Sequence, residues 1–204
     1  YEIHWRDWSS DVCSSDLRRA FIYKNVGTGT TYAGIAQNNV GGPNSASLSG
    51  IGPGVLSSAS QDGVIMLAAE SLFLQAEAAS KGYIVGDAES FYNAGVQASF
   101  DYLGAGSAAG YLTSYPFPNS TAVNLEAIIY QKWVALIGIN GFESWIEYRR
   151  TGFPADLPVA PNQTNSTVIP VRLLYPTSEY AANPDNVPTQ SSGDAFTSKV
   201  FWQN

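Results

Sequence analysis

The stretch that most constrains the fold is residues 126–154, which reads as two helices joined by a turn and followed by a stop. The first half spaces its apolar residues at a helical period, which predicts one apolar stripe made of Ile128, Ile129, Trp133, Leu136 and Ile137. Gly138 and Gly141, with Asn140 between them, tolerate the backbone angles of a sharp turn. A long helix, a tight turn and a second helix are therefore expected here.

The second helix carries Phe142, Trp145 and Ile146 on one side. At an apolar helix position a large aromatic side chain is usually buried, so Trp145 is expected in the core, with contact to a ligand as the alternative. Gly152 is suited to a C-terminal cap, and Pro154 prevents the helix from continuing. The pattern thus predicts a helix that ends sharply before residue 154.

The charged side of this helix allows two interpretations. Glu143 and Glu147 are two carboxylates four residues apart, and a carboxylate pair is what a glycosidase needs. However, Arg150 follows Glu147 at a spacing that lets the charges meet, and Arg149 lies beside it. Carboxylates next to guanidinium groups stay ionised and are poor general acids. Structural ion pairing is therefore the favoured interpretation.

Residues 1–17 do not resemble natural protein sequence. Asp7 to Leu17 back-translate into a common sequencing-library adapter, and Tyr1 to Ile3 fit the preceding adapter end. We interpret residues 1–17 as a translated sequencing-adapter artefact and leave them out of the fold reasoning. The single Cys (Cys13) and the single His (His4) both fall inside this segment.

Residues 18–204 therefore contain neither Cys nor His, and their nine Lys and Arg against 13 Asp and Glu give a net charge of −4. This composition argues against disulfides, thiolate nucleophiles, the Ser-His-acid triad and zinc sites built on Cys or His. A nucleic-acid partner is not expected either, because nucleic acid requires a basic surface. No metal, no cofactor and no catalytic residue is expected.

The segment before the long helix divides into three parts. Residues 20–23 are apolar and aromatic and suggest a short strand, followed by a Gly-, Ser- and Asn-rich loop up to residue 60. Residues 61–104 predict a helical hairpin that ends its first helix at Gly82 and caps its second with Asp87. Small residues between its helices resemble one tetratricopeptide-type repeat.

Residues 104–120 are predicted to form a flexible and then aromatic loop. Its aromatic residues are Tyr111, Tyr115 and Phe117. Aromatic rings on a loop can stack on the apolar C–H faces of sugars, which makes these three the candidate ligand-binding residues. The alternative, in which they fill a gap between helices, is the more common fate of aromatic side chains.

Several motifs occur in a fixed order along the chain: Q-K-W at 131–133, W-x-E-x-R-R-T-G-x-P at 145–154, I-P-x-R at 169–172 and Y-P-x-x-E at 175–179. In this order they resemble the C-terminal part of SusD-like proteins, also called the SusD/RagB family. Upstream the resemblance continues through Ala69-Glu70-Ser71 and Ala76-Glu77-Ala78-Ala79, and downstream to Asn183, Asp194 and Phe201-Trp202. Residues 18–204 are therefore expected to be the C-terminal part of a SusD-like domain.

The resemblance implies a mainly α fold of tetratricopeptide-like helical hairpins with long irregular loops. It also implies an outer-membrane, surface-exposed lipoprotein of Bacteroidetes that binds glycans or other nutrients without transforming them. Such a protein delivers its ligand to a SusC-like TonB-dependent transporter and touches the membrane only through a lipid anchor, which would lie upstream of this chain. The matched motif residues are interpreted as architectural: Trp145, Glu147, Arg149, Arg150, Gly152, Pro154, Arg172 and Glu179.

Two other functions are alternatives at this point. One is a tetratricopeptide-type scaffold that binds a protein partner, and the other is a fragment of a glycoside hydrolase. The tail, residues 155–204, is rich in Pro, Asn and Ser and predicts short extended pieces. Within it, Arg172 and Glu179 are expected to pair, and Phe201-Trp202 to fix the C-terminus by burial.

Overall fold

The computed structural model describes residues 16–34, 44–155, 157 and 168–201. The chain divides into two compact units, the first formed by residues 1–36 and 41–158 and the second by residues 37–40 and 159–204. The described residues are helical and contain no strand apart from an isolated bridge between Tyr23 and Ile51. The predicted mainly α fold is therefore confirmed. None of the described helices combines the length and apolar character needed to cross a membrane.

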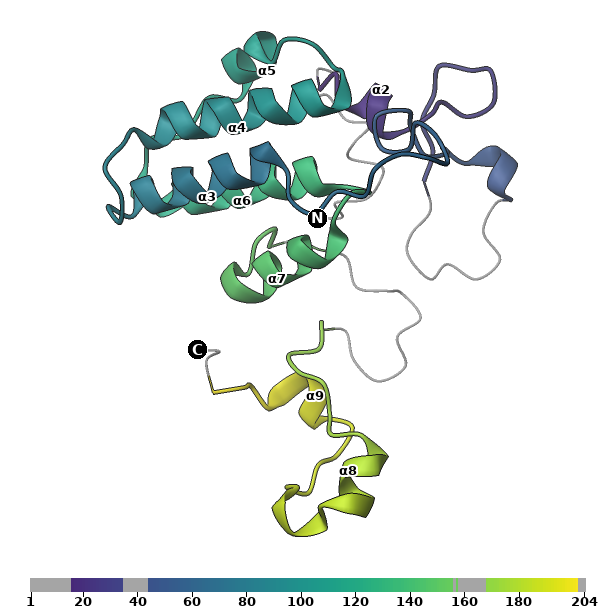
Figure 1. Ribbon diagram of the computed structural model, residues 1–204, viewed down its shortest axis with the longest axis vertical. Coiled ribbons are helices and arrows are strands. Elements are labelled where there is room, and N and C mark those ends of the chain that lie inside the picture. The colour runs from purple at the N-terminus through teal and green to yellow at the C-terminus, as the bar shows by residue number, and fades with distance from the viewer. Residues whose placement is uncertain (1–15, 35–43, 156, 158–167, 202–204) are drawn as a thin grey trace. The chain divides into compact units, whose positions relative to one another are not determined.

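The first unit is built on three helices that run side by side: α3 (Ala68–Ser80), α4 (Ala88–Leu103) and α6 (Thr121–Leu136) (Figure 1). The short helix α5 (Ala109–Ser114) contacts α4, and α7 (Gly141–Thr151) contacts α6. The predicted hairpin and the predicted pair of helices at 121–151 are both present. The first hairpin helix begins at residue 68, later than the sequence suggested.

The helix ends follow from their local sequence. Asp87 caps α4 by accepting a hydrogen bond from the backbone N–H of Ser90 at 3.0 Å, and Gly104 ends the helix in the left-handed conformation. Asn140 caps α7 in the same way, accepting from the backbone N–H of Glu143 at 3.3 Å. At the other end of α7, Gly152 is the C-cap at φ 78°.

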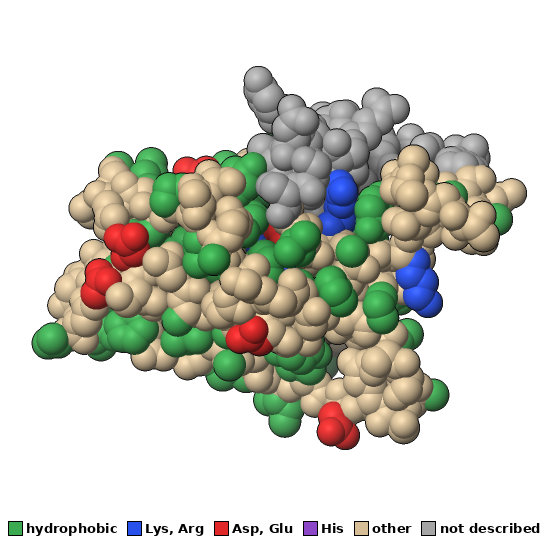
Figure 2. All heavy atoms as spheres, turned by 90° about the horizontal axis from the view of Figure 1, so that it is seen from above, with side chains coloured by type: hydrophobic (Ala, Val, Ile, Leu, Met, Phe, Trp, Pro, Cys, Tyr) green, Lys and Arg blue, Asp and Glu red, His purple; other side chains and the backbone are tan. Residues whose placement is uncertain are grey.

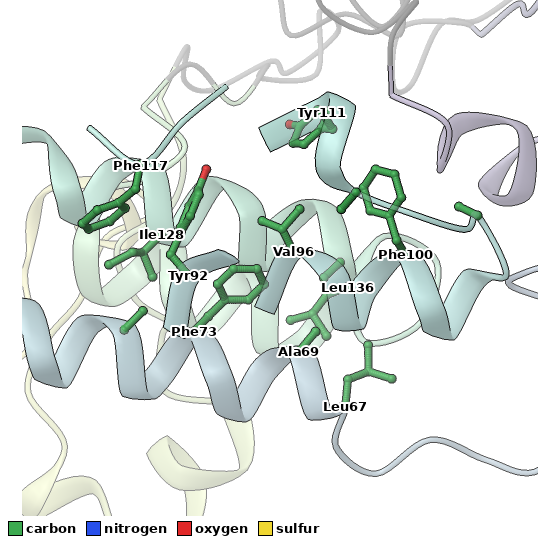
Figure 3. Packing of buried hydrophobic residues seen from close by; sticks show 14 residues of the cluster. Leu67, Ala69, Phe73, Tyr92, Val96, Phe100, Tyr111, Phe117, Ile128 and Leu136 are labelled. Carbon is green, nitrogen blue, oxygen red and sulfur yellow. The ribbon is translucent and has the colours of Figure 1, made fainter. Parts of the chain in front are cut away.

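The hydrophobic core lies between α3, α4 and α6 (Figure 3). Its fully buried side chains include Phe73, Val96, Phe100, Ile128 and Leu136. Close approach of α3 and α4 depends on a glycine, since a Cβ added at Gly95 would lie 2.8 Å from the Phe73 ring. Most of the buried hydrophobic residues of the unit lie on α3, α4 and α6, so these three helices supply much of its buried apolar surface.

Of residues 20–23, predicted as a strand, the first three belong instead to a short helix, α2 (Arg19–Ile22). The backbone N–H of Ile22 bonds to the carbonyl of Arg18 at 2.9 Å, so the local bonds are helical. Only Tyr23 is extended, and it bridges Ile51. The prediction was wrong because an apolar run of four residues does not distinguish a helical turn from a strand.

The aromatic loop also differs from the prediction, because residues 109–114 form the helix α5. Residues 44–60 are irregular as predicted, except for the 3-10 turn η2 (Ser45–Ser47). On the face seen in Figure 2, hydrophobic side chains are scattered among polar ones and charged side chains are few.

The second unit contains α8 (Thr177–Ala182), the 3-10 turn η3 (Pro184–Asn186) and α9 (Asp194–Thr197). None of its described residues, 168–201, is buried. Phe201 is almost fully exposed, which contradicts the prediction that burial of Phe201 fixes the C-terminus, and Trp202 lies outside the described residues. The described residues of this unit contain no buried core against which this ring could pack.

Candidate functional site

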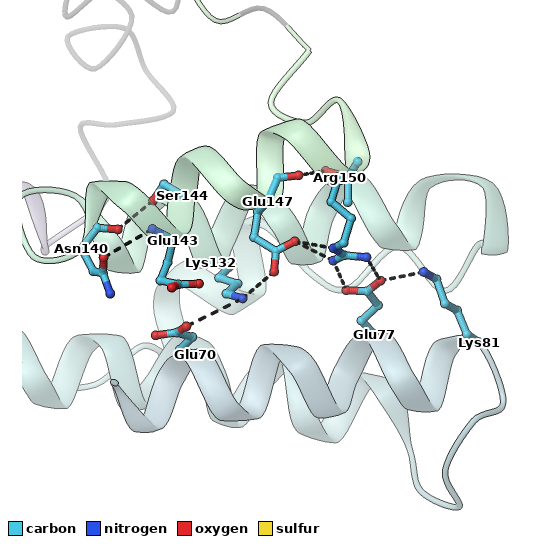
Figure 4. Close-up of polar contacts among 10 residues, drawn as sticks. Glu70, Glu77, Lys81, Lys132, Asn140, Glu143, Ser144, Glu147 and Arg150 are labelled. Atoms are coloured by element: carbon cyan, nitrogen blue, oxygen red, sulfur yellow. Dashed lines mark hydrogen bonds and ion pairs between the residues drawn. The ribbon is translucent and has the colours of Figure 1, made fainter. Parts of the chain in front are cut away.

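Five charged side chains form a continuous chain of ion pairs across α3, α6 and α7 (Figure 4). The Lys132 ammonium lies 2.6 Å from the Glu147 carboxylate, and Arg150 lies 2.6 Å from the same carboxylate. Arg150 also donates two parallel hydrogen bonds to Glu77, at 2.6 and 2.7 Å, and Lys81 donates to Glu77 at 2.6 Å. This ion network, Lys81–Glu77–Arg150–Glu147–Lys132, ties α7 to the hairpin.

The ion network favours the charged state of the Glu77 carboxylate. Burial raises the pKa of the Glu77 carboxyl, but hydrogen bonds from Arg150 and Lys81 outweigh burial and bring it below its usual range. The hydrogen bonds that Arg150 donates to the Glu77 and Glu147 carboxylates in turn raise the pKa of the Arg150 guanidinium. An ionised carboxylate clamped by cations cannot donate a proton to a leaving group, so the network is built for support.

Glu70 lies at the edge of this network and is less well compensated. One of its oxygens is 4.0 Å from the Lys132 ammonium, while the other, Oε2, is buried without a hydrogen-bond partner. The Lys132 ammonium therefore interacts with both Glu70 and Glu147, but its short contact is to Glu147. Among the described residues, no group of three or more Asp, Glu, His or Cys side chains is placed to hold a metal ion.

A second buried polar cluster surrounds Arg18. Its guanidinium bonds to Gln131 at 3.0 Å and to Ser99 at 3.2 Å, and also, at 2.7 Å, to Asp16, which lies in the segment that we interpret as adapter-derived. Gln131 also donates to the hydroxyl of Tyr111 at 2.7 Å. Sequence reasoning missed this cluster, although Gln131 belongs to the Q-K-W motif, because the partners are separated by up to 113 positions.

The three candidate ligand-binding aromatics lie mostly inside the molecule. Tyr111 and Phe117 are buried, and Tyr115 is half-buried. Their rings pack on other aromatic rings, with centroid distances of 5.8 Å for Phe100–Tyr111, 5.1 Å for Tyr92–Phe117 and 5.0 Å for Tyr111–Tyr115. The structure thus places them as the packing alternative describes, because α5 folds back over α4 and carries Tyr111 inward.

Trp145 is the opposite case. Its expected burial in the core is wrong, since 41 % of it is exposed and its neighbour Phe142 is 70 % exposed. The reason is that α7 turns Glu147 and the ion network toward the other helices, which leaves its apolar side facing outward. Trp145 stacks on Tyr148 at 5.6 Å and 29°, and the Arg149 guanidinium lies 5.9 Å from its ring centre.

We define the α7 aromatic face as Phe142, Trp145, Tyr148 and Arg149. Because the same helix is held from behind by the ion network, the rings of this face are presented on a rigid element. An exposed tryptophan ring stacked on a half-buried tyrosine ring can bind flat, partly apolar ligands by stacking and burial. The sequence placed Trp145 and Glu147 on opposite sides of the helix, but it did not show that the side with Glu147 faces the other helices.

The remaining motif residues differ in their surroundings. Gly152 caps α7, and Pro154 is buried after a cis peptide bond with Phe153. The predicted pair between Arg172 and Glu179 is not among the salt bridges of the described residues. Arg172 instead lies 5.8 Å from the ring centre of Tyr175, and Glu179 sits in the first turn of α8, where the helix dipole favours a negative charge.

Comparison with protein families finds one match that covers most of the chain. Residues 14–176 match a SusD-like family described as "Starch-binding associating with outer membrane". No curated protein matches the chain.

Several solved structures are similar to the chain. One is described as a chitin-binding protein: it is 32 % identical over 70 % of this chain and 33 % of its own, with a TM-score of 0.58. A SusD homologue from Bacteroides vulgatus is 30 % identical over 83 % of this chain and 42 % of its own, with a TM-score of 0.68. Another, from Bacteroides thetaiotaomicron, is 34 % identical over the same shares, with a TM-score of 0.67. The chain thus spans less than half the length of these relatives.

Proposed function

The chain belongs to the SusD-like family, and from this we propose that it takes part in binding a glycan at the outer membrane without chemical change to it. The observation that carries the proposal is the α7 aromatic face, with Trp145 exposed and stacked on Tyr148. Sugar rings have apolar C–H faces that pack well on exposed aromatic rings. We assign contact with the glycan to Trp145 and Tyr148.

Binding without catalysis is supported by the electrostatics of the two carboxylates in the ion network. Glu147 and Glu77 are both bound by Arg150 at 2.6 Å, and the pKa of Glu77 is lowered. A glycosidase needs one carboxyl group that stays protonated and a second that faces the substrate. The ion network supplies neither.

Delivery of the glycan to a SusC-like TonB-dependent transporter is the second part of the proposal, and surface exposure through a lipid anchor is the third. Both parts rest on the membership of this chain in the SusD-like family. The chain spans about a third to two fifths of the similar structures described above.

The test is a titration of the protein with maltooligosaccharides and chitooligosaccharides in a calorimeter. Trp145→Ala should weaken binding by about tenfold, the loss expected when a stacked ring is removed, whereas Trp145→Tyr should retain most of the affinity. Tyr102→Ala is the matched control, because Tyr102 is a partly exposed aromatic residue on α4, away from the α7 aromatic face.

Two results would overturn the proposal. One is an unchanged affinity in Trp145→Ala. The other is continued release of shorter sugars from the bound oligosaccharide, followed by chromatography, since this would identify an enzyme.

A further inference from the structure

The loop between α3 and α4 exposes three consecutive apolar side chains. Tyr83 is 78 % exposed, Ile84 is partly exposed and Val85 is fully exposed. We define these three residues as the hairpin tip. The loop forms the free end of the α3–α4 hairpin, away from α2 (Figure 1). Isolated apolar residues are common on protein surfaces, but a contiguous run at the end of a hairpin is not explained by core packing.

The backbone holds the hairpin tip in a projecting position. The backbone N–H of Tyr83 bonds to the carbonyl of Ala78 at 2.8 Å, so the loop is continuous with the end of α3. Glycines with positive φ flank the tip, Gly82 at 72° and Gly86 at 152°. At Gly86 an added Cβ would lie 2.6 Å from the Phe91 ring, so the loop passes close over α4. The tip is therefore presented by fixed geometry.

The charges beside the hairpin tip are bound to partners within their own helices. Lys81 donates to Glu77 at 2.6 Å. Asp87 accepts from the backbone N–H of Ser90 at 3.0 Å and from its hydroxyl, and these bonds lower its pKa. The tip thus offers apolar side chains flanked by one cationic residue, Lys81, and one anionic residue, Asp87.

We propose that the hairpin tip inserts into the interfacial layer of a lipid bilayer, with zwitterionic lipid as its ligand; this is a membrane contact in addition to the lipid anchor that the family resemblance implies. Tyr83 suits the boundary between headgroups and acyl chains, because its ring is apolar and its hydroxyl is polar. Ile84 and Val85 would lie deeper. Three side chains are far fewer than the ~20–30 residues a side of a stable protein interface, whereas membrane binding grows with each apolar group inserted. Size therefore favours lipid over protein.

The test is co-sedimentation of the full chain with vesicles of phosphatidylcholine and phosphatidylethanolamine. The variant Tyr83→Ser/Ile84→Ser/Val85→Ser should reduce the partition coefficient by about tenfold or more, given the apolar surface removed. The matched control is Ile65→Ser/Met66→Ser, which removes exposed apolar residues just before the opposite end of α3, with Ile65 92 % exposed. Thermal melts followed by circular dichroism check that each variant is folded.

A second readout reports on the tip itself. A fluorophore attached to Val85→Cys, in a Cys13→Ser background, should shift to shorter wavelength when vesicles are added. Equal partitioning of the tip variant and the control variant would overturn the proposal, as would an unshifted fluorophore. Tip-dependent binding to vesicles that carry outer-membrane proteins, without binding to lipid alone, would identify a protein partner and would also overturn it.

Discussion

Arg150 is the residue on which the ion network converges, because it bonds to carboxylates from two helices. Its guanidinium is bidentate to Glu77 and also bonds to Glu147 at 2.6 Å. A lysine could not reproduce this geometry, since the planar guanidinium has fixed parallel donors. At the residue scale, the R-R pair of the motif therefore has a divided role: Arg150 faces the network and Arg149 lies over Trp145.

Glu77→Gln should lower stability at neutral pH and reduce its dependence on pH. Because the pKa of Glu77 is lower in the folded state, its carboxylate stabilises the fold above the unfolded pKa, ~4.3, and loses this effect as the pH falls through the folded value. We expect the variant to lose about 1–3 kcal/mol at pH 7, as for hydrogen bonds to charged groups. The difference from the parent should shrink below about pH 4.

Urea unfolding across a pH series measures this. Glu126→Gln is the matched control, because Glu126 is exposed on α6. A stability difference between parent and Glu77→Gln that stays constant down to pH 2 would contradict the prediction.

At the scale of elements, α3 and α4 approach closely because a glycine faces an aromatic ring. Gly95 lies on α4 against Phe73 of α3, and any Cβ at this position would overlap the ring. The close approach of the two hairpin helices therefore depends on one small residue. The other helices pack on this pair: α6 along both helices and α5 over α4.

Gly95→Ala should destabilise the protein by about 1–3 kcal/mol, the usual result of overpacking a core. The expected cause is displacement of Phe73, which has no exposed surface to move into. Thermal unfolding followed by circular dichroism measures the loss.

Gly110→Ala is the control for the helix propensity of alanine, because a Cβ there meets nothing within 4 Å. It should be neutral or slightly stabilising. Equal effects of the two substitutions would show that the helices do not meet at Gly95.

At the scale of the whole molecule, the two units differ in how they are stabilised. The first has an aromatic and aliphatic core and two buried polar clusters. The described residues of the second contribute short helices and turns with no buried side chain. Helices of four to six residues are not stable by local interactions alone.

Amide hydrogen exchange should therefore separate the two units. We expect strong protection in α3, α4 and α6, where exchange requires global unfolding, and little protection in α8 and α9. Mass spectrometry of peptides after exchange gives the comparison within one sample. Protection of α8 equal to that of α4 would contradict this prediction.

The sequence by itself determined the positions of those helices for which the apolar periodicity, the capping residues and the stop residues all indicate the same boundaries. Asp87, Gly138 and Gly152 mark boundaries that the structure keeps, and the order of motifs around Trp145 and Arg150 identified the family. These features are local, because caps and turn glycines act within a few residues of their own backbone.

Only the tertiary structure decided which face of each helix is buried. Periodicity placed Trp145 and Ile146 on one side of α7 but could not show that this side faces outward, because the opposite side carries Glu147 and Arg150, whose partners Glu77 and Lys132 lie on other helices. The same holds for Tyr111, which is buried because Gln131 and Phe100 surround it. Burial depends on contacts between residues far apart in the chain, and no local pattern contains them.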